Sequence, residues 1–289
     1  MKKIITAVRL LIFNRSLFIS KVLKLIKLDL DTLKILKFSL LRKIFKLSKG
    51  KVLQGPYRDL DFSVSIDSFI KNELVGEREW RREYSSYYNQ LLMGFYELDV
   101  VINAIALAKK YKLNHIINFG TADGIHLIGL VKNKIFKNGI GFEKDSFFRK
   151  LLIKNSIKNR VSNKVKVFAD INISHINKCS VDLKKTLFII DVDGYEFKLF
   201  SEKNIPFFKD SYLIIEFHPR AVSNKLLVNK FLNLINNYFK VSVIKDDYFY
   251  NNKIPYNQFF EQLTDDERWI LLSGSRGSKM SWLQLTPKH

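Results

Sequence analysis

The stretch IINFGTADGIHLIGL, from Ile116 to Leu130, decides the fold of this chain. A short apolar run leads into a turn with Gly120, Ala122 and Gly124, and an apolar helical pattern follows the turn. Small residues let the backbone approach a bound ligand, and free N–H groups at a helix start attract negative charge. The stretch therefore predicts the first βα unit of a nucleotide-binding sheet.

The same alternation of short apolar runs and helical stretches continues along the chain and is typical of βαβ units. The segments between the runs are long enough for crossover helices. We expect strands at Ile116–Phe119, Gly139–Phe142, Lys164–Phe168, Leu187–Val192, Tyr212–Phe217, Val241–Lys245 and Trp282–Leu285. Helices are expected at Leu98–Lys110 and Leu226–Tyr238, and a long loop-rich segment at Tyr248–Met280. These elements predict an α/β fold with a Rossmann-like, mostly parallel sheet.

Length and charge limit the organisation of the chain and its partners. A chain of 289 residues holds one α/β domain of ordinary size and an appendage. The formal net charge is +21, but residues 1–51 contain fourteen Lys/Arg against two acids, so this segment contributes +12 of it. An excess of Lys, Ile and Asn is also typical of an AT-rich coding background. Charge alone is therefore weak evidence for a nucleic-acid partner, and we expect none.

Apolar and basic residues repeat at helical spacing in residues 1–48, which predicts one or two amphipathic helices. They either contact an anionic membrane surface or form a helical cap packed on the domain. We divide the chain into a basic helical segment at 1–50, a helical approach segment on the substrate side at 51–110, and a Rossmann-like domain at 111–289. The sequence has a single cysteine, Cys179, no evident secretory signal, and no uncharged stretch of about 20 residues that could span a membrane. These features predict a cytoplasmic protein, which would be peripheral at the inner membrane face if residues 1–48 bind the membrane.

Polar groups follow the second and third expected strands. Glu143, about twenty residues after the glycine turn, can accept hydrogen bonds from two ribose hydroxyls. Asp170 can accept from an adenine amine, with Ile171 against the ring. The alternative for the second strand is a helix N-cap, for which Asp145 is the better candidate. The glycine turn is also shorter than the GxGxxG spacing of dinucleotide sites, so the ligand expected here is a nucleoside without a pyrophosphate.

The fourth and fifth strands end in a second polar group. Asp191, Asp193 and Glu196 surround the first turn, while Glu216 and His218 end the next strand. Asp191, Glu216 and His218 are the candidates for the reacting end of the cleft, because imidazole can take a proton from a hydroxyl near neutral pH. The alternative is structural, with His218 capping the strand and Asp191 ordering the turn. The spacing matches no recognised metal motif, so we expect no metal.

The succession FGTADG, FEKD, ADI, IDVDGYE and IIEFHP resembles the FkbM-like branch of S-adenosylmethionine-dependent methyltransferases. The resemblance covers about Gly94 to Phe217 and includes a GFYELDV segment before the first strand. It implies a class I methyltransferase sheet with an antiparallel last strand, and S-adenosyl-L-methionine as cofactor. The chain departs from the family pattern at Ala122, which replaces a glycine, and at Asn118, where an acid is usual. Asn118 can still bind the methionine part of the cofactor.

The resemblance implies O-methylation of a sugar, glycan or small-molecule hydroxyl. The cofactor would contact Asn118, Gly120, Ala122, Gly124, Glu143, Asp170 and Ile171. One alternative is an RNA methyltransferase, although the Asn/Asp-Pro-Pro-aromatic element usual for base amines does not follow the fourth strand. The other is a non-catalytic membrane-surface protein that retains the fold.

Overall fold

A computed structural model of the chain describes residues 30–73, 84–222, 224–245, 258–273 and 281–288. The strands in these ranges form one seven-stranded sheet in the order β3-β2-β1-β4-β5-β7-β6. The strands are β1 (His115–Phe119), β2 (Asn138–Phe142), β3 (Val165–Phe168), β4 (Thr186–Ile190), β5 (Tyr212–Phe217), β6 (Phe239–Lys245) and β7 (Ser281–Pro287). The first five pair in parallel, and β7 runs antiparallel to both β5 and β6. The expected fold class, including the antiparallel last strand, is confirmed.

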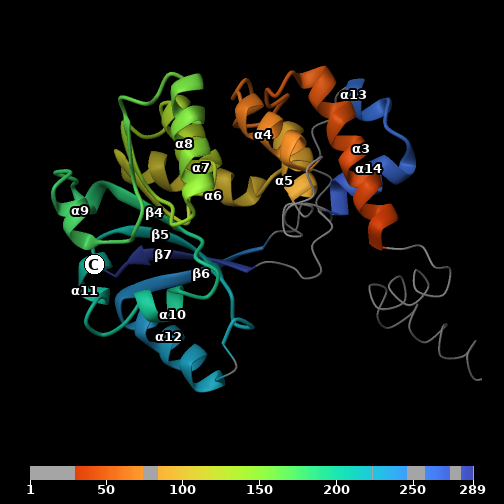
Figure 1. Cartoon of the computed structure of the whole chain (residues 1–289). Coiled ribbons are helices and arrows are strands. Elements are labelled where there is room, and N and C mark those ends of the chain that lie inside the picture. The colour runs from red at the N-terminus through yellow and green to blue at the C-terminus, as the bar shows by residue number, and fades with distance from the viewer. Residues whose placement is uncertain (1–29, 74–83, 223, 246–257, 274–280, 289) are drawn as a thin grey trace, which may run out of the picture.

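The central strands are apolar on both faces because helices cover both sides of the sheet (Figure 1). Side chains alternate between the faces, so Ile116 packs into one core cluster and Ile117 into the other. One face is covered by α6 (Leu98–Tyr111), α7 (Ile125–Lys132) and α8 (Ser146–Lys158). The other is covered by α9 (Ile173–Asn177), α10 (Glu196–Leu199), α11 (Ile205–Phe208) and α12 (Lys225–Tyr238). A short 3₁₀ helix, Leu183–Lys185, precedes β4. The result is a three-layer arrangement with two apolar interiors.

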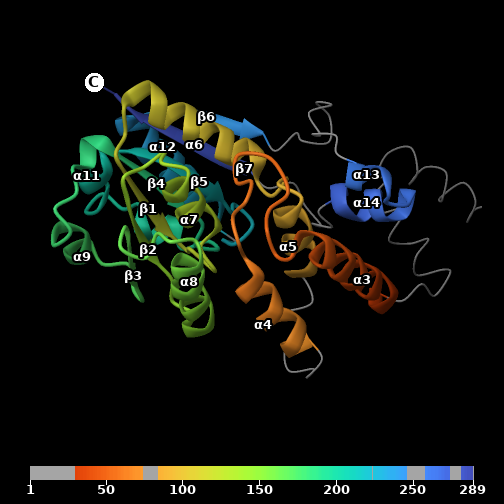
Figure 2. The same cartoon turned by 90° about the horizontal axis from the view of Figure 1, so that it is seen from above.

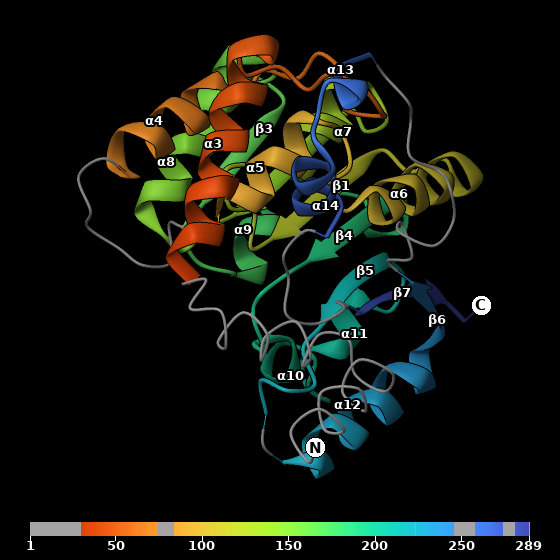
Figure 3. The ribbon, with the colours of Figure 1, turned by 90° about the vertical axis from the view of Figure 1, so that its right-hand side faces the viewer.

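A group of helices from the two ends of the described chain lies beside the sheet (Figures 2 and 3). It comprises α3 (Leu30–Ser48), α4 (Ser63–Glu73), α5 (Tyr84–Leu92), α13 (Gln258–Glu261) and α14 (Asp265–Ser273). Lys43 on α3 forms a 2.8 Å ion pair with Glu267 on α14. Gln90 on α5 donates to the carbonyl of Leu271 on α14 (3.2 Å). Contacts between segments far apart in sequence therefore hold this group together.

Two sequence expectations need correction here. Tyr248–Met280 was expected to be loop-rich, but its described residues include α13 and α14, which place Phe259 and Leu271 in the core shared with α3 and α5. The fourth strand was expected to reach Val192, but it ends at Ile190, after which the chain turns toward α10. Asp191 therefore lies in the turn and not within the strand.

The strand order reverses between β1 and β4, since β2 and β3 lie on one side of β1 and β4 lies on the other. The loops that follow β1 and β4 leave in opposite directions at this point. Open α/β sheets bind ligands in the crevice that forms at the carboxyl ends of such strands. The expected binding residues lie at or after the carboxyl ends of the first four strands, so the topology brings them to one edge of the sheet.

Candidate nucleotide and acceptor site

A cavity of about 680 Å³ lies at the carboxyl ends of β1 to β4. This volume is in the range of small-molecule sites. Six of the residues predicted from the sequence line it together: Gly120, Ala122, Glu143, Asp170, Ile171 and Asp191. Phe142, Phe148 and Tyr195 add aromatic surface. The cavity thus combines apolar and aromatic surface with several carboxylates, groups that can hold the ring and the hydroxyls of a nucleoside.

The glycine turn after β1 brings the backbone close to the neighbouring loop. Gly120 has a φ of 72°, and a Cβ at this position would lie 1.6 Å from the carbonyl oxygen of Asp191. No other residue type fits there, because both the left-handed backbone and the contact exclude a side chain. Gly120 and Thr121 donate their N–H groups to the Phe142 carbonyl and tie the turn to β2. The loops after β1 and β4 are therefore close together at the cavity.

Glu143, directly after β2, is nearly buried, with 9% of its surface exposed. Its Oε2 accepts from the N–H of Ala122 (2.7 Å) and its Oε1 from the N–H of Asp145 (2.8 Å). Burial raises the pKa of Glu143, while these backbone donors oppose the shift. Each carboxylate oxygen has a second acceptor direction, so Glu143 can bind a diol while it stays fixed by the backbone.

Asp145 and Asp170 lie in different environments at the carboxyl edge of the sheet. The side chain of Asp145 accepts from the N–H groups of Phe147 and Phe148 and caps α8, as the sequence suggested for this residue. Asp170 follows β3, is exposed, and lines the cavity beside the partly buried Ile171. An exposed carboxylate at this position can accept a hydrogen bond from an amine at the solvent-facing end of a ligand.

Asn118 and Gly124 do not line the cavity. The side-chain amide of Asn118 is 2% exposed and donates to the carbonyl of Ile189 (3.1 Å), which joins β1 to β4. Gly124 begins α7, and a Cβ there would lie 2.4 Å from the Leu152 side chain on α8. Both contacts are structural, so a direct contact of either residue with the cofactor stays a prediction.

The three residues predicted for the reacting end lie together beside this cavity. His218 Nε2 is 3.9 Å from Asp191 Oδ1 and 3.8 Å from Glu216 Oε2. Glu196, fully buried on α10, accepts at Oε1 from the backbone N–H of His218 (2.9 Å) and lies 3.3 Å from its Nδ1. Glu196 therefore fixes the orientation of the ring that faces the other carboxylates.

Burial and neighbouring charge set the protonation of this group. Burial raises the pKa of Asp191 to about 6, and the charges of Glu97 and Asp193 add to the increase. The hydrogen bond to Glu196 raises the pKa of His218, against an opposing effect of burial. Burial thus brings the pKa of Asp191 toward neutral pH, while the neighbouring carboxylates favour the protonated form of His218.

A buried hydrogen-bonded chain that the sequence did not predict reaches the site from the N-terminal side. Tyr57 Oη is 3.1 Å from His126 Nδ1, and His126 Nε2 is 2.7 Å from Glu97 Oε2. Glu97 is 8% exposed and has a left-handed backbone with φ 45°. The only sequence signal was the GFYELDV segment, because His126 alone resembles an isolated histidine. Glu97 is close enough to Asp191 to raise its pKa, so this chain borders the reacting end.

A second group that the sequence missed lies under the glycine turn. Asp123 is 1% exposed and accepts from the hydroxyls of Tyr87 (2.6 Å) and Tyr88 (3.2 Å) on α5. Asn155 on α8 donates to the Asp123 carbonyl (2.9 Å). These bonds join the turn to the helices around it and keep the cavity wall rigid.

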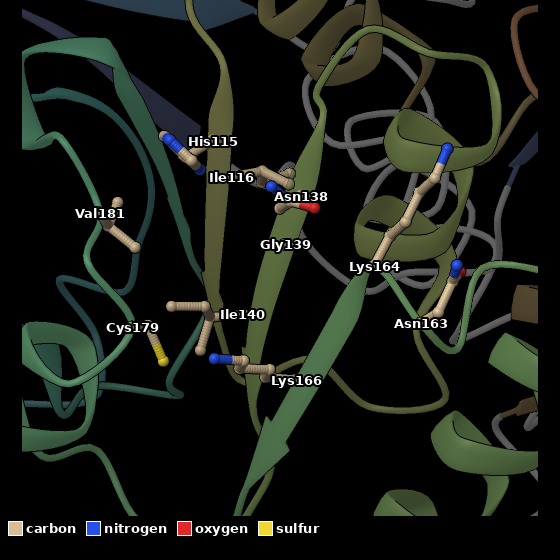
Figure 4. Close-up of a pocket in the computed structure, with 10 residues that line it drawn as sticks. All are labelled: His115, Ile116, Asn138, Gly139, Ile140, Asn163, Lys164, Lys166, Cys179 and Val181. Atoms are coloured by element: carbon tan, nitrogen blue, oxygen red, sulfur yellow. The ribbon is translucent and has the colours of Figure 1, made fainter.

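A smaller cavity of about 190 Å³ lies at the opposite, amino ends of β1 to β3 (Figure 4). Its lining includes His115, Lys164, Lys166 and Cys179. Figure 4 shows the side chains of Lys164 and Lys166 pointing in different directions. The polar groups do not converge, and the larger cavity is the candidate site.

The sheet and its cavity define a Rossmann-like α/β protein of the class I methyltransferase arrangement. No family model matches the sequence, and no curated protein is similar to it. Solved structures with a similar fold include an O-methyltransferase of Klebsiella pneumoniae described as putative, with 11% identity and a TM-score of 0.46 over 78% of this chain and 97% of that one. Another is the O-methyltransferase TomG of Streptomyces achromogenes, in complex with S-adenosylmethionine, with 12% identity and a TM-score of 0.45 over 78% and 96%. These identities are too low to transfer an activity to this chain.

Proposed function

We propose that this protein is an S-adenosyl-L-methionine-dependent methyltransferase that methylates an oxygen atom. The observation that carries the proposal is the set of groups on one cavity wall. Glu143, held by two backbone N–H groups, suits a ribose diol, and Asp170 with Ile171 suits an adenine. The turn from Gly120 to Gly124 is shorter than the GxGxxG turn of dinucleotide sites, which favours a ligand without a pyrophosphate.

The remaining groups at this edge of the sheet suit the acceptor. The sulfonium is already reactive, so the protein has to align the acceptor oxygen with the methyl group and remove its proton. Asp191 lies where the cofactor cavity meets the group around His218. As the S–C bond breaks and the C–O bond forms, the hydroxyl proton passes to one of Asp191, Glu216 and His218. The products are the methyl ether and S-adenosylhomocysteine.

The FkbM-like motifs support a sugar, glycan or small-molecule hydroxyl as the acceptor. The elements that carry the resemblance, IDVDGYE and IIEFHP, are the ones that supply Asp191, Glu216 and His218. An RNA acceptor is less well supported, because the charge of the chain is concentrated in residues 1–51 and not around the cavity.

We also propose that the N-terminal segment contacts an anionic membrane surface. One face of α3 is buried, with Leu40, Leu41 and Ile44 at most 1% exposed. Leu36 and Leu47 lie at the edge of this face and are 46% and 52% exposed, while the exposed basic side chains Arg42 and Lys46 lie on the remaining surface of the helix. The packed cap and the membrane contact are therefore compatible on the same helix. None of the described helices is long and apolar enough to cross a bilayer.

Calorimetric titration of the purified chain with S-adenosylhomocysteine and, separately, with NAD tests the cofactor assignment. We expect saturable binding of S-adenosylhomocysteine and none of NAD. Transfer of a labelled methyl group from the donor to fractions of a cell extract then identifies the acceptor class. A chain that binds NAD, or neither ligand, would rule out the proposal.

A further inference from the structure

Four carboxylates surround a single imidazole at the reacting end of the cavity. Besides its contact with Glu196, His218 places Nε2 at 3.9 Å from Asp191 Oδ1, 3.8 Å from Asp193 Oδ1 and 3.8 Å from Glu216 Oε2. These distances are too long for hydrogen bonds. Ligands on one ion with bonds of about 2.1–2.3 Å lie about 3.0–3.8 Å apart, so the spacing fits a shared cation with a small inward movement.

The orientation of the ring supports the same conclusion. Glu196 lies 3.3 Å from Nδ1 and accepts the backbone N–H of the same residue, which fixes the ring and favours the proton on Nδ1. The lone pair of Nε2 then points toward the three carboxylates. Histidines that ligate metal ions are usually held in this way, by a carboxylate on the other ring nitrogen.

The charge of the group is also unbalanced. Glu196 is 0% exposed, and its Oε2 has no hydrogen-bond partner. Among the residues that the structure describes, no lysine or arginine forms an ion pair with Asp191, Asp193 or Glu196. Buried carboxylates are costly without a compensating charge, and a divalent cation supplies two positive charges at once.

We propose that Asp191, Asp193 and His218 bind a divalent cation of the Mn²⁺ type. Their ligand atoms lie within 4.8 Å of one another. Two carboxylates with one imidazole suit Mn²⁺ and its neighbours better than Ca²⁺, which prefers a full oxygen set. The side chain of Asp193 is 99% exposed on a turn with φ 47°, so it can move inward to complete the site. This replaces the sequence expectation of no metal.

The consequence for the chemistry rests on the proposed function. Three protein ligands leave positions open, and the acceptor hydroxyl can occupy one of them. A bound cation would lower the pKa of that hydroxyl and so favour loss of its proton. In that arrangement His218 would serve as a ligand, and Glu216, which is buried and outside the ligand set, would accept the proton before releasing it to solvent.

Titration of the full chain with Mn²⁺ tests the site, with free Mn²⁺ followed by electron paramagnetic resonance, with and without S-adenosylhomocysteine. We expect one saturable ion per chain. Asp193→Asn should weaken binding at least about tenfold, because it removes a charged ligand. Asp59→Asn is the matched control, since Asp59 is also an exposed aspartate with a left-handed backbone, and it should bind as the unaltered chain does.

Two results would overturn the proposal: no saturable Mn²⁺ binding in either condition, or equal affinity in Asp193→Asn and Asp59→Asn. S-adenosylhomocysteine affinity measured on the same samples separates the two hypotheses. If that affinity is retained while Mn²⁺ does not bind, only the cation site is wrong. If both are lost in the folded chain, the proposed function is wrong as well.

Discussion

The backbone holds the Glu143 carboxylate at the place that we propose for a ribose. Its two oxygens are fixed by the N–H groups of Ala122 and Asp145, so the carboxylate is in position before any ligand arrives. A group that is already ordered loses little conformational entropy on binding, and its hydrogen bonds therefore contribute more to affinity.

Glu143→Ala should weaken S-adenosylhomocysteine binding by about 1–3 kcal/mol, the scale of lost hydrogen bonds to a charged group. The measurement is calorimetric titration of the variant, with its fold checked by circular dichroism. Glu202→Gln, an exposed acid on the chain after α10, is the control and should bind normally. An unchanged affinity in folded Glu143→Ala would remove Glu143 from the site.

The same residue predicts a pH dependence. Burial raises the pKa of Glu143, and only the ionised form can accept from both ribose hydroxyls. Cofactor affinity should therefore be highest above the raised pKa of Glu143. It should fall as the pH decreases through that pKa, at a higher pH than the one at which an ordinary glutamate is protonated. Affinity in Glu143→Gln should be lower throughout and lack this transition. An identical pH profile in both proteins would show that another group controls binding.

At the reacting end, Asp191→Asn and His218→Ala should each lower turnover about a hundred- to ten-thousand-fold while cofactor affinity stays within a few-fold. The loss follows whether these residues take the proton or hold the cation that activates the hydroxyl. The measurement is steady-state methyl transfer to the identified acceptor. A purely structural role would instead lower the melting temperature and leave activity in the surviving protein.

At the scale of elements, the sheet was predictable because each strand is a short apolar run with a clear end. The expected and observed limits of the strand from Tyr212 to Phe217 coincide. The limits of the other strands differ by at most two residues at either end. The glycine turn and the acids after β2, β3 and β4 were predictable for the same reason, since position relative to a strand end fixes their edge of the sheet.

The contacts between distant segments were not predictable. The pairing of Glu97 with His126 joins two segments 29 residues apart, and the contact of Lys43 with Glu267 spans most of the chain. Neither partner is unusual in its own segment. Asn118 shows the same limit, because a polar residue at a strand end suits a ligand or a neighbouring strand equally well until the packing is known.

The helix α3 offers a test of its packing. Leu41 is fully buried, and Leu41→Ala should cost about 2–5 kcal/mol through lost contacts and the cavity left behind. Thermal unfolding should show a melting temperature lower by about 5–15 °C. Leu47→Ala on the same helix, at 52% exposure, should change it little. Equal effects of the two substitutions would mean that α3 does not pack as described.

At the scale of the whole molecule, the structure separates the two proposed sites in space. The cavity lies at the carboxyl edge of the sheet, between the loops after β1 and β4. The helices α3, α5 and α14 lie beside the sheet (Figure 3). They share a hydrophobic core with the helices on that face of the sheet, to which Leu92 on α5 and Leu127 on α7 both belong. The proposed membrane contact of α3 would therefore leave the cavity open.

The charge distribution predicts how such a contact behaves. Residues 1–51 carry a net +12, and each basic side chain near an anionic surface contributes about 1 kcal/mol at moderate ionic strength. The full chain should float with vesicles that contain anionic lipid at low salt and separate from them at about 1 M salt, where the Debye length is only about 3 Å. Vesicles of neutral lipid alone should not bind it.

The exposed leucines at the edge of the buried face of α3 should add to this attraction. Leu36→Glu with Leu47→Glu replaces both with acids, so flotation should fall strongly while the melting temperature is nearly unchanged, because both side chains are about half exposed. Ile153→Glu on α8 is the matched control, with 45% exposure on a different helix, and should float as the unaltered chain does. If the α3 variant floats normally, the basic residues alone account for the contact. If the unaltered chain does not float at low salt, α3 serves only as a packed cap, and its exposed leucines have no part in membrane binding.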